Sequence, residues 1–126
     1  MAKEDPLDTF GRFVMVHLRD RGIDHLEGLL SGHWKAPSLK KLQKALLRLP
    51  QGERALVRRA FVAALDSAVH DFLFALQEET DGGGAVVARV RGKNVATLSD
   101  GLQGELFTED GWYARFSAHG EPPEEA

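Results

Sequence analysis

The middle of the chain constrains the fold more than any other part of the sequence. Residues 52–79 follow a helical pattern that is much longer than the usual helix of about 11–12 residues. The second half of this stretch is apolar almost all round, with alanines at positions 60, 63, 64, 68 and 75. A helix that is apolar on most sides is buried on most sides. We therefore predict a long central helix wrapped by the rest of the chain. Its one polar stripe consists of Asp66, Ser67, His70, Asp71, Gln77 and Glu78.

Three shorter helices are predicted before the central one. Apolar residues recur every three or four positions over residues 6–21, 25–30 and 38–49. Gly22 and Gly32 are expected to end the first and second of these helices, since glycine is common just beyond a helix C-terminus. The third is expected to lie between Pro37 and Pro50, because proline fits the first helical turn and breaks a helix interior.

The hydrophobic period changes from 3.6 to 2 after the glycines at positions 82–84. Residues 85–91 and 94–98 predict a hairpin with Gly92 and Lys93 in a type II′ turn, which pairs Val90 with Val95. A last strand is predicted over residues 112–117. The stretch between the hairpin and this strand, residues 99–111, is open to interpretation as a strand or a loop.

Helices first and strands afterwards indicate an α+β fold. We expect three to four N-terminal helices, the long central helix among them, packed on a small C-terminal antiparallel sheet. Such a sheet is too small to be stable alone, so it needs the central helix. Residues 1–117 are predicted to form this single domain, and residues 118–126 a disordered acidic tail.

Several function classes are excluded or disfavoured by composition. The chain has no cysteine, which excludes a disulfide scaffold, a thiolate metal site and a cysteine nucleophile. His17, His25 and His33 lack the spacing of metal ligands, so we expect no metal and no other cofactor. No apolar run approaches the roughly 20 residues of a membrane span, and the N-terminus lacks a signal peptide. These observations predict a soluble cytoplasmic protein that does not contact a membrane.

Charge is distributed in blocks, which bears on association. The formal net charge is −3, yet residues 35–59 carry eight basic groups against one acid and residues 60–84 carry five acids and no base. Residues 99–126 carry seven acids against Arg115. Acidic groups beside aromatic anchors can form a protein-binding surface, in which the charge steers a basic partner. The candidate surface consists of Asp100, Glu105, Phe107, Glu109, Asp110, Trp112 and Tyr113.

Three alternatives stand beside this interaction surface. Asp66, His70 and Asp71 could form a polar site for a small ligand or a hydrolytic reaction, because a carboxylate four residues from a histidine can orient the imidazole. The basic segment, residues 35–59, could bind nucleic acid, although the net negative charge of the whole chain makes this less favoured. A homodimer is a third alternative, formed through a sheet edge or through the stripe that holds Phe74. The basic candidates are Lys40, Lys41, Lys44, Arg48, Arg54, Arg58 and Arg59. No catalytic set is assembled in the sequence, which favours a non-enzymatic protein.

Three motifs carry a resemblance to other proteins. They are Val-His-Asp-Phe-Leu-Phe-Ala-Leu-Gln-Glu at positions 69–78, Ser-Asp-Gly-Leu-x-Gly-Glu at 99–105 and Gly-Trp-x-x-Arg-Phe-Ser at 111–117. Over residues 55–117 the chain resembles a group of small uncharacterised bacterial proteins. Helix-plus-hairpin proteins of this kind are similar to immunity proteins of bacterial toxin systems. The resemblance implies a protein that covers a basic site on a toxin, and it supplies no catalytic residues.

Overall fold

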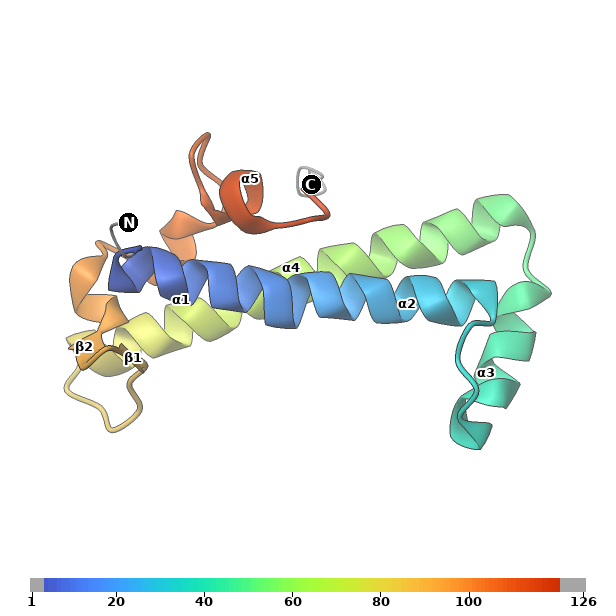
Figure 1. Ribbon diagram of the computed structural model, residues 1–126, viewed down its shortest axis with the longest axis horizontal. Helices are drawn as coiled ribbons and strands as arrows, with labels where there is room; N and C mark the ends of the chain where they lie inside the picture. Colours follow the sequence, from blue (N-terminus) through green and yellow to red (C-terminus); the bar gives the residue numbers. More distant parts are fainter. Residues whose placement is uncertain (1–3, 121–126) are drawn as a thin grey trace.

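The computed structural model describes residues 4–120 of the chain and shows an α+β fold, as predicted. Two long helical rods lie side by side, and the C-terminal quarter of the chain packs against one end of them (Figure 1). Residues 121–126 of the predicted disordered tail lie outside the described residues. Two residues of that tail, Ala118 and His119, lie against the first rod, where they contact Asp20 and Asp24.

The first rod is one continuous helix made of α1 (Pro6–Val14), η1 (Met15–Asp20) and α2 (Arg21–Ser31). The prediction that Gly22 ends the first helix is therefore wrong. A Cβ at Gly22 would lie 3.1 Å from Cδ2 of Leu65 in the second rod, so this glycine allows the two rods to approach closely. Gly32 follows the last residue of α2, which confirms the predicted end of that helix.

The η1 segment is a π-helix, whose wider turn changes the direction of the side chains that follow it. Within this turn Met15, Arg19 and Asp20 are buried, although two of the three are charged. Turns of this kind are rare, and they occur frequently at functional sites. Both buried charged residues, Arg19 and Asp20, form hydrogen bonds in a polar network that reaches α4 and the end of the described chain.

The second rod is α4 (Gln51–Asp81), a helix of 31 residues that confirms the predicted long central helix. It spans about 46 Å at 1.5 Å per residue. The shorter α3 (Pro37–Leu47) joins the two rods and projects from the end opposite the C-terminal segment (Figure 1). Pro37 opens α3 and Pro50 precedes α4, as the sequence predicted.

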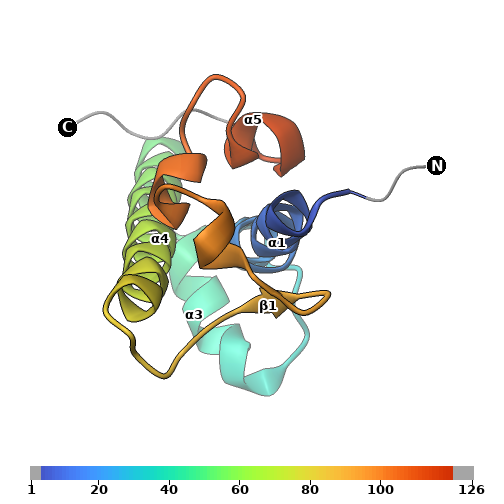
Figure 2. The ribbon, with the colours of Figure 1, turned by 90° about the vertical axis from the view of Figure 1, so that its left-hand side faces the viewer.

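Burial of α4 on most sides, however, is wrong. The first rod covers one side and the C-terminal segment covers another, which leaves a broad outer side exposed (Figure 2). On that outer side Phe72 is 57% exposed and Phe74 is 45% exposed. Asp66 and Gln77, from the predicted polar stripe, are instead buried. The small C-terminal segment is too short to cover the whole circumference of a 31-residue helix.

By length and composition α4 could cross a membrane, contrary to the expectation that no stretch of the chain could. A third of its most apolar 18-residue window is buried within the fold. The core helix of a soluble protein passes the same test, so this property alone does not assign α4 to a membrane.

The sheet consists of two short antiparallel strands, β1 (Arg89–Val90) and β2 (Lys93–Asn94). Val90 pairs with Lys93, so the turn residues are Arg91 and Gly92 rather than the predicted Gly92 and Lys93. Their φ angles are 48° and 80°, and two positive values are characteristic of a type I′ turn. The predicted pairing of Val90 with Val95 is wrong because the chain leaves the sheet after Asn94.

Short helices replace the other predicted strands. They are η2 (Val95–Leu98), η3 (Leu102–Glu105) and α5 (Trp112–Phe116). The predicted strand over residues 112–117 is wrong, since Trp112 and Phe116 are one helical turn apart and both turn toward α1. A five-residue segment with apolar side chains at both ends fits the helical period of 3.6 as well as the strand period of 2, so its packing decides which structure it forms.

Gln77 on α4 connects the C-terminal segment to the central helix. Its side-chain amide donates to the carbonyl of Ala96 in η2 at 3.1 Å, and its carbonyl accepts from the backbone N–H of Leu102 in η3 at 2.9 Å. Both partners are buried, so a polar residue holds the two short helices on the core. The core around this point consists of Val14, Met15, Val69, Leu73, Leu76, Val95, Ala96, Leu102, Leu106, Trp112 and Tyr113.

Candidate interaction surface

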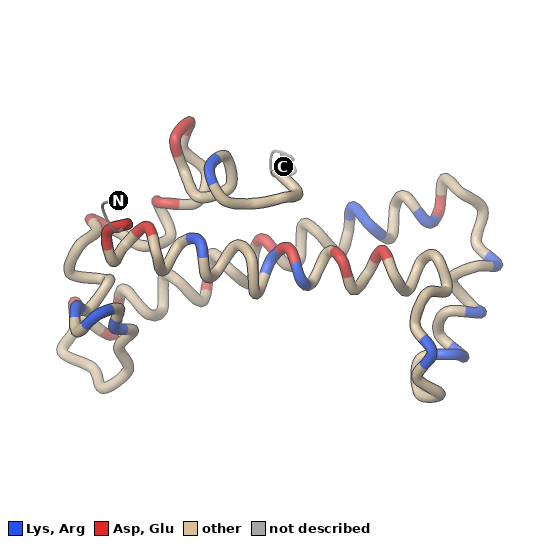
Figure 3. Tube along the Cα trace, viewed as in Figure 1, with Lys and Arg blue, Asp and Glu red and all other residues tan. Residues whose placement is uncertain are grey.

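The predicted interaction residues surround the loop between η3 and α5. We call residues 105–110 the acidic loop. The backbone closes it tightly, because Tyr113 N–H donates to the carbonyl of Leu106 at 3.2 Å and Gly111 N–H donates to that of Thr108 at 2.8 Å. A Cβ at Gly111 would lie 2.7 Å from the carbonyl oxygen of Leu106, so only glycine fits at this closure. The loop projects from the body of the protein with acidic residues at its tip (Figures 1 and 3).

Phe107 is the exposed aromatic residue of the acidic loop. Its side chain is 43% exposed, and its ring centroid lies 4.9 Å from that of Tyr113. Glu109 and Asp110 are exposed beside it, while Glu105 is half-buried. Burial is the main cause that raises the pKa of Glu105 above its ordinary value. Asp100 is exposed at an open hollow of about 370 Å³, which Glu105 also lines.

Trp112 and Tyr113 do not belong to this surface. Trp112 is 1% exposed and Tyr113 is 5% exposed, so the prediction that they contact a partner directly requires a correction. Trp112 packs across α1, where a Cβ at Gly11 would lie 2.3 Å from the indole ring, and its ring centroid lies 6.0 Å from that of Phe10. The two residues support the acidic loop from beneath, because α5 turns them toward the rods.

A buried polar network lies behind the acidic loop. Arg19 is fully buried, and its Nε donates to Asp66 Oδ1 at 2.8 Å. The hydroxyl of Tyr113 donates to the same carboxylate oxygen, and the Arg19 guanidinium lies 4.2 Å from the centre of the Tyr113 ring. The network therefore joins the first rod, α4 and α5 at one point.

The same network holds the end of the described chain. Arg19 donates to the hydroxyl of Ser117 at 3.1 Å and to the carbonyl of His119. Asp20 accepts from the Ser117 hydroxyl at 2.6 Å and from the backbone N–H of Ala118 at 2.8 Å. Neither Arg19 nor Asp20 was identified from the sequence. No local pattern marks them, because their burial depends on the π-helical turn and on partners 47 or more residues away.

The electrostatics of the network favour a structural role. Burial tends to lower the pKa of Arg19, but the hydrogen bond and the negative charge of Asp66 raise it above its ordinary value overall. Burial also raises the pKa of the Tyr113 phenol, and the hydrogen bond to Asp66 adds to this effect. Arg19 thus stays charged and Tyr113 stays protonated. Buried groups that satisfy one another in this way stabilise one arrangement of the chain.

Titration of the single tyrosine tests this network. Because the pKa of Tyr113 is raised in the folded protein, the associated stability is present below the ordinary phenol pKa of about 10 and is lost as the pH rises through the folded value. We expect phenolate absorbance to appear only together with unfolding, as followed by far-ultraviolet circular dichroism. Tyr113→Phe serves as the control that removes the signal. Ionisation near pH 10 with full helicity would contradict the buried hydrogen bond.

The three residues of the alternative polar site lie in two different environments. Asp66 belongs to the buried network, whereas the imidazole Nδ1 of His70 lies 3.1 Å from Asp71 Oδ1 in an exposed pair. Among the described residues Asp66 and His70 make no mutual hydrogen bond, so the carboxylate four residues from the histidine does not orient the imidazole, and Asp71 is the carboxylate that contacts it.

The basic segment lies at the opposite end from the acidic loop (Figure 3). Lys40, Lys41, Lys44 and Arg48 are exposed on or next to α3. On α4, Arg58 pairs with Glu27 at 3.1 Å and Arg54 donates to the carbonyl of Leu30 at 3.4 Å. These two arginines therefore help to hold α4 on α2. Nucleic-acid binding by this segment stays a prediction.

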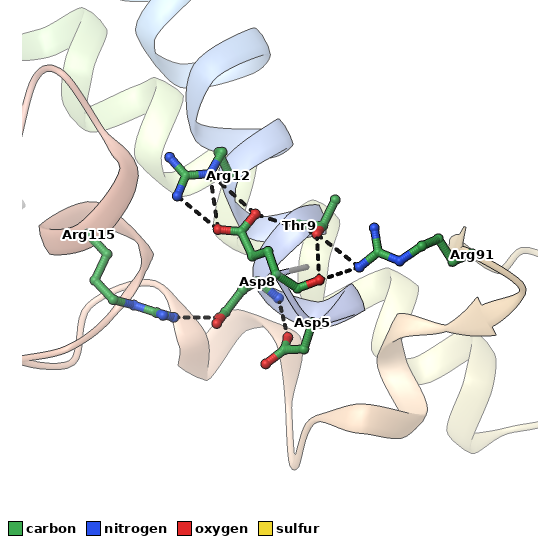
Figure 4. A network of polar contacts seen from close by, with 7 residues as sticks. Asp5, Asp8, Thr9, Arg12, Arg91 and Arg115 are labelled. Atoms are coloured by element: carbon green, nitrogen blue, oxygen red, sulfur yellow. Dashed lines mark hydrogen bonds and ion pairs between the residues drawn. The ribbon is translucent and has the colours of Figure 1, made fainter. Parts of the chain in front are cut away.

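A network of ion pairs and hydrogen bonds between surface side chains holds the start of α1 (Figure 4). Arg12 makes a two-pronged ion pair with Glu4 at 2.8 and 3.1 Å, and that hydrogen bond is the main cause that lowers the pKa of Glu4. Arg115 pairs with Asp8 at 2.7 Å, and Arg91 donates to the Glu4 carbonyl. Exposed pairs of this kind add little stability singly, but these connect α5 and the hairpin to α1.

Three side chains near the end of the described chain could each offer a metal ligand atom. The atoms of Asp24, Glu27 and His119 lie within 4.8 Å of one another. Each is already engaged, because His119 Nε2 lies 2.7 Å from Asp24 Oδ1 and Glu27 pairs with Arg58. The cluster is accounted for by these contacts, and we assign no metal to it.

Comparison with known proteins adds no parallel for this surface. No family model matches the chain, and neither a curated protein nor a solved structure matches it significantly. The resemblance to toxin-system immunity proteins stays a prediction. Arguments about function are therefore built on the geometry of the acidic loop and of the helices beneath it.

Proposed function

We propose that this protein is a non-enzymatic protein-interaction module that binds a basic partner through the acidic loop. One observation carries this proposal. Phe107 is 43% exposed, it rests on the ring of Tyr113, and acidic side chains flank it on a tightly closed loop. An aromatic anchor within a charged rim is the arrangement that protein interfaces use for affinity and steering.

The acidic loop is closed by backbone hydrogen bonds and supported by α5. One closing hydrogen bond comes from Tyr113 in α5 and the other from Gly111 just before it, and α5 is fixed on the rods by Trp112 and by the Arg19 network. A binding loop that is already ordered loses less conformational entropy on association. Rigid support therefore favours a role in binding over a role as a mobile connection.

The charge of the surface indicates the chemistry of the partner. Asp100, Glu105, Glu109 and Asp110 contribute four carboxyl groups, while the nearby Arg115 is paired with Asp8. Such a patch accelerates encounter with a basic surface and repels an acidic one. A basic site on a toxin, as expected of an immunity-like protein, has this chemistry. The cytoplasmic location expected from the sequence belongs to the same proposal.

Affinity capture with matched baits tests the proposed function. Wild-type protein, Phe107→Ser and Glu109→Lys are compared as baits in native lysate, and each captured partner is then purified and its dissociation constant measured. We expect a basic partner whose dissociation constant rises at least about tenfold with either variant and also rises with added salt. Glu53→Lys makes the same charge change at an exposed position on α4 and is expected to bind like wild type.

The outcomes of this experiment separate the alternatives. Equal capture by wild type and by both loop variants would overturn the role of the acidic loop. An acidic partner, or binding that does not depend on salt, would contradict the proposed electrostatic steering. Loss of binding with Glu53→Lys as well would show that the effect of Glu109→Lys comes from net charge alone.

A further inference from the structure

Helix α3 is rich in leucine, yet the fold buries little of it. The helix is described throughout, and Gln43 is its one buried residue, although residues 39–49 include five leucines. Leu42 and Leu47 are each 47% exposed, and the other three leucines are half-buried. The side-chain amide of Gln43 exchanges two hydrogen bonds of 2.9 Å with the backbone of Trp34, just beyond the end of α2. In Figure 1 α3 projects away from both rods, so a broad side of this helix faces outward.

The outward side of α3 is strongly basic. Its exposed cations, which we call the basic stripe, are Lys40, Lys41, Lys44 and Arg48. At about 100° per residue these four positions lie within about 100° of one another around the helix. Residues 32–52, which contain α3 and both of its connections, carry five bases and no acid. The nearest acids along the chain are Glu27, which pairs with Arg58, and Glu53. The positive charge of this segment is therefore not neutralised within it.

Exposed leucines border the basic stripe on both edges. By the same helical period Leu47 lies about 20° beyond Lys40, and on the other edge Ala45 and then Leu42 follow Lys41. Nucleic acids are bound through cations together with stacking aromatic residues, whereas the exposed apolar residues beside this stripe are aliphatic. Cations next to leucines match the boundary of a lipid bilayer, where anionic headgroups lie beside acyl chains. The chemistry of α3 therefore favours lipid over nucleic acid.

We propose that the basic stripe and its bordering leucines bind this protein to the surface of an anionic lipid membrane. The cytoplasmic leaflet of a membrane is such a surface. The lysine and arginine heads lie among the headgroups, while Leu42 and Leu47 enter the apolar boundary. The sequence-based expectation of no membrane contact depended on the lack of a spanning segment. Peripheral docking through α3 needs no such segment.

The net negative charge of the chain does not prevent this contact. Helix α3 and the acidic loop lie at opposite ends of the molecule and project to opposite sides of the rods (Figures 1 and 3). Exposed charges more than about 8 Å from a charged surface are largely screened at physiological ionic strength. The membrane therefore interacts mainly with the charges on and near α3. The acidic loop stays free for the proposed basic partner, so the two proposals are independent.

Vesicle binding with matched variants tests this proposal. The full chain is sedimented with vesicles of phosphatidylcholine alone or with about one third phosphatidylserine, and we expect binding only to the anionic vesicles and less binding as salt is added. Lys44→Glu is expected to weaken binding at least about fivefold, since each cation near such a surface contributes about that factor. Arg21→Glu makes a similar charge change at an exposed position of α2 outside the basic stripe and is expected to bind like wild type.

A second pair of variants tests the leucines at constant charge. Leu42→Ser is expected to weaken binding to the anionic vesicles at least about threefold, because its side chain no longer gains from leaving water. Leu98→Ser makes the same change at a leucine of η2 that is 42% exposed, and it is expected to bind like wild type. Circular dichroism of each variant confirms that α3 and the rods remain folded.

The remaining outcomes would each overturn the proposal. Wild-type protein that ignores anionic vesicles at low salt has no such membrane contact. Undiminished binding by Lys44→Glu or by Leu42→Ser would show that the basic stripe or its leucines do not make the contact. Binding to a DNA duplex but not to vesicles, abolished by Lys44→Glu, would identify nucleic acid as the occupant instead. The acidic loop is tested separately, since Glu109→Lys is expected to keep full vesicle binding.

Discussion

Replacing Asp66 with alanine is expected to lower the free energy of unfolding by about 3–5 kcal/mol, the usual cost of leaving one charge of a buried pair without its partner. Arg19 is fully buried, and its Nε donates a hydrogen bond to Asp66 Oδ1 with an N-to-O distance of 2.8 Å. The same substitution removes the acceptor of the Tyr113 hydroxyl. Domains have a total stability of about 5–15 kcal/mol, so this loss is a large fraction of it. Urea unfolding followed by circular dichroism measures the change.

Two control variants make this result specific. Asp71→Ala removes an exposed carboxylate from the same helix and is expected to cost less than about 1 kcal/mol. The triple variant Arg19→Met/Asp66→Leu/Tyr113→Phe removes both buried charges and the hydroxyl that would lose its acceptor, and it is expected to recover much of the loss, since apolar replacements of buried pairs are often neutral. A cost below about 1 kcal/mol for Asp66→Ala would contradict the buried ion pair.

Trp112→Ala is expected to cost about 3–5 kcal/mol, the range measured when large aromatic residues are removed from protein cores. Trp112 is 1% exposed and fills the space between α5 and α1. Its loss would leave a cavity and would loosen the support of the acidic loop. Chemical unfolding measures the stability, and amide hydrogen exchange in residues 105–117 measures the loosening.

Gly11 supplies the control for this packing. A Cβ at Gly11 would meet the indole ring at 2.3 Å, so Gly11→Ala is expected to destabilise the wild type by about 1–3 kcal/mol through overpacking. In the Trp112→Ala background the added methyl group enters the cavity, and the same substitution is expected to be neutral or stabilising. Additive effects of the two substitutions would contradict the contact between them.

Local sequence features predicted those helices whose ends are marked by a proline or a glycine. The bounds of α4 were readable because Pro50 precedes the helix and three glycines follow it. Gly22 was misread for the opposite reason. Its function depends on Leu65, which lies on another helix, and no local rule distinguishes a glycine that ends a helix from one that admits a neighbour.

The candidate site was predicted in part. Phe107 and three of the four acidic residues lie at the surface as expected, but Glu105 is half-buried and Trp112 and Tyr113 are buried. A short run of aromatic and polar residues fits a strand or a helix equally well, and which side faces solvent depends on the element beneath it. Arg19 is separated from Asp66 by 47 positions, so the pairing that buries both lies beyond any sequence pattern.

The helical character of the chain before the glycines at 82–84, the long central helix and the block distribution of charge were determined by the sequence alone, because periodicity and breaker residues act over a few neighbouring positions. Only the tertiary structure decided which sides of that helix are covered, which charged residues are buried and which aromatic residues stay at the surface. Burial is a property of docking between distant segments, and the small C-terminal segment covers one side of α4 while the outer side of this helix remains exposed.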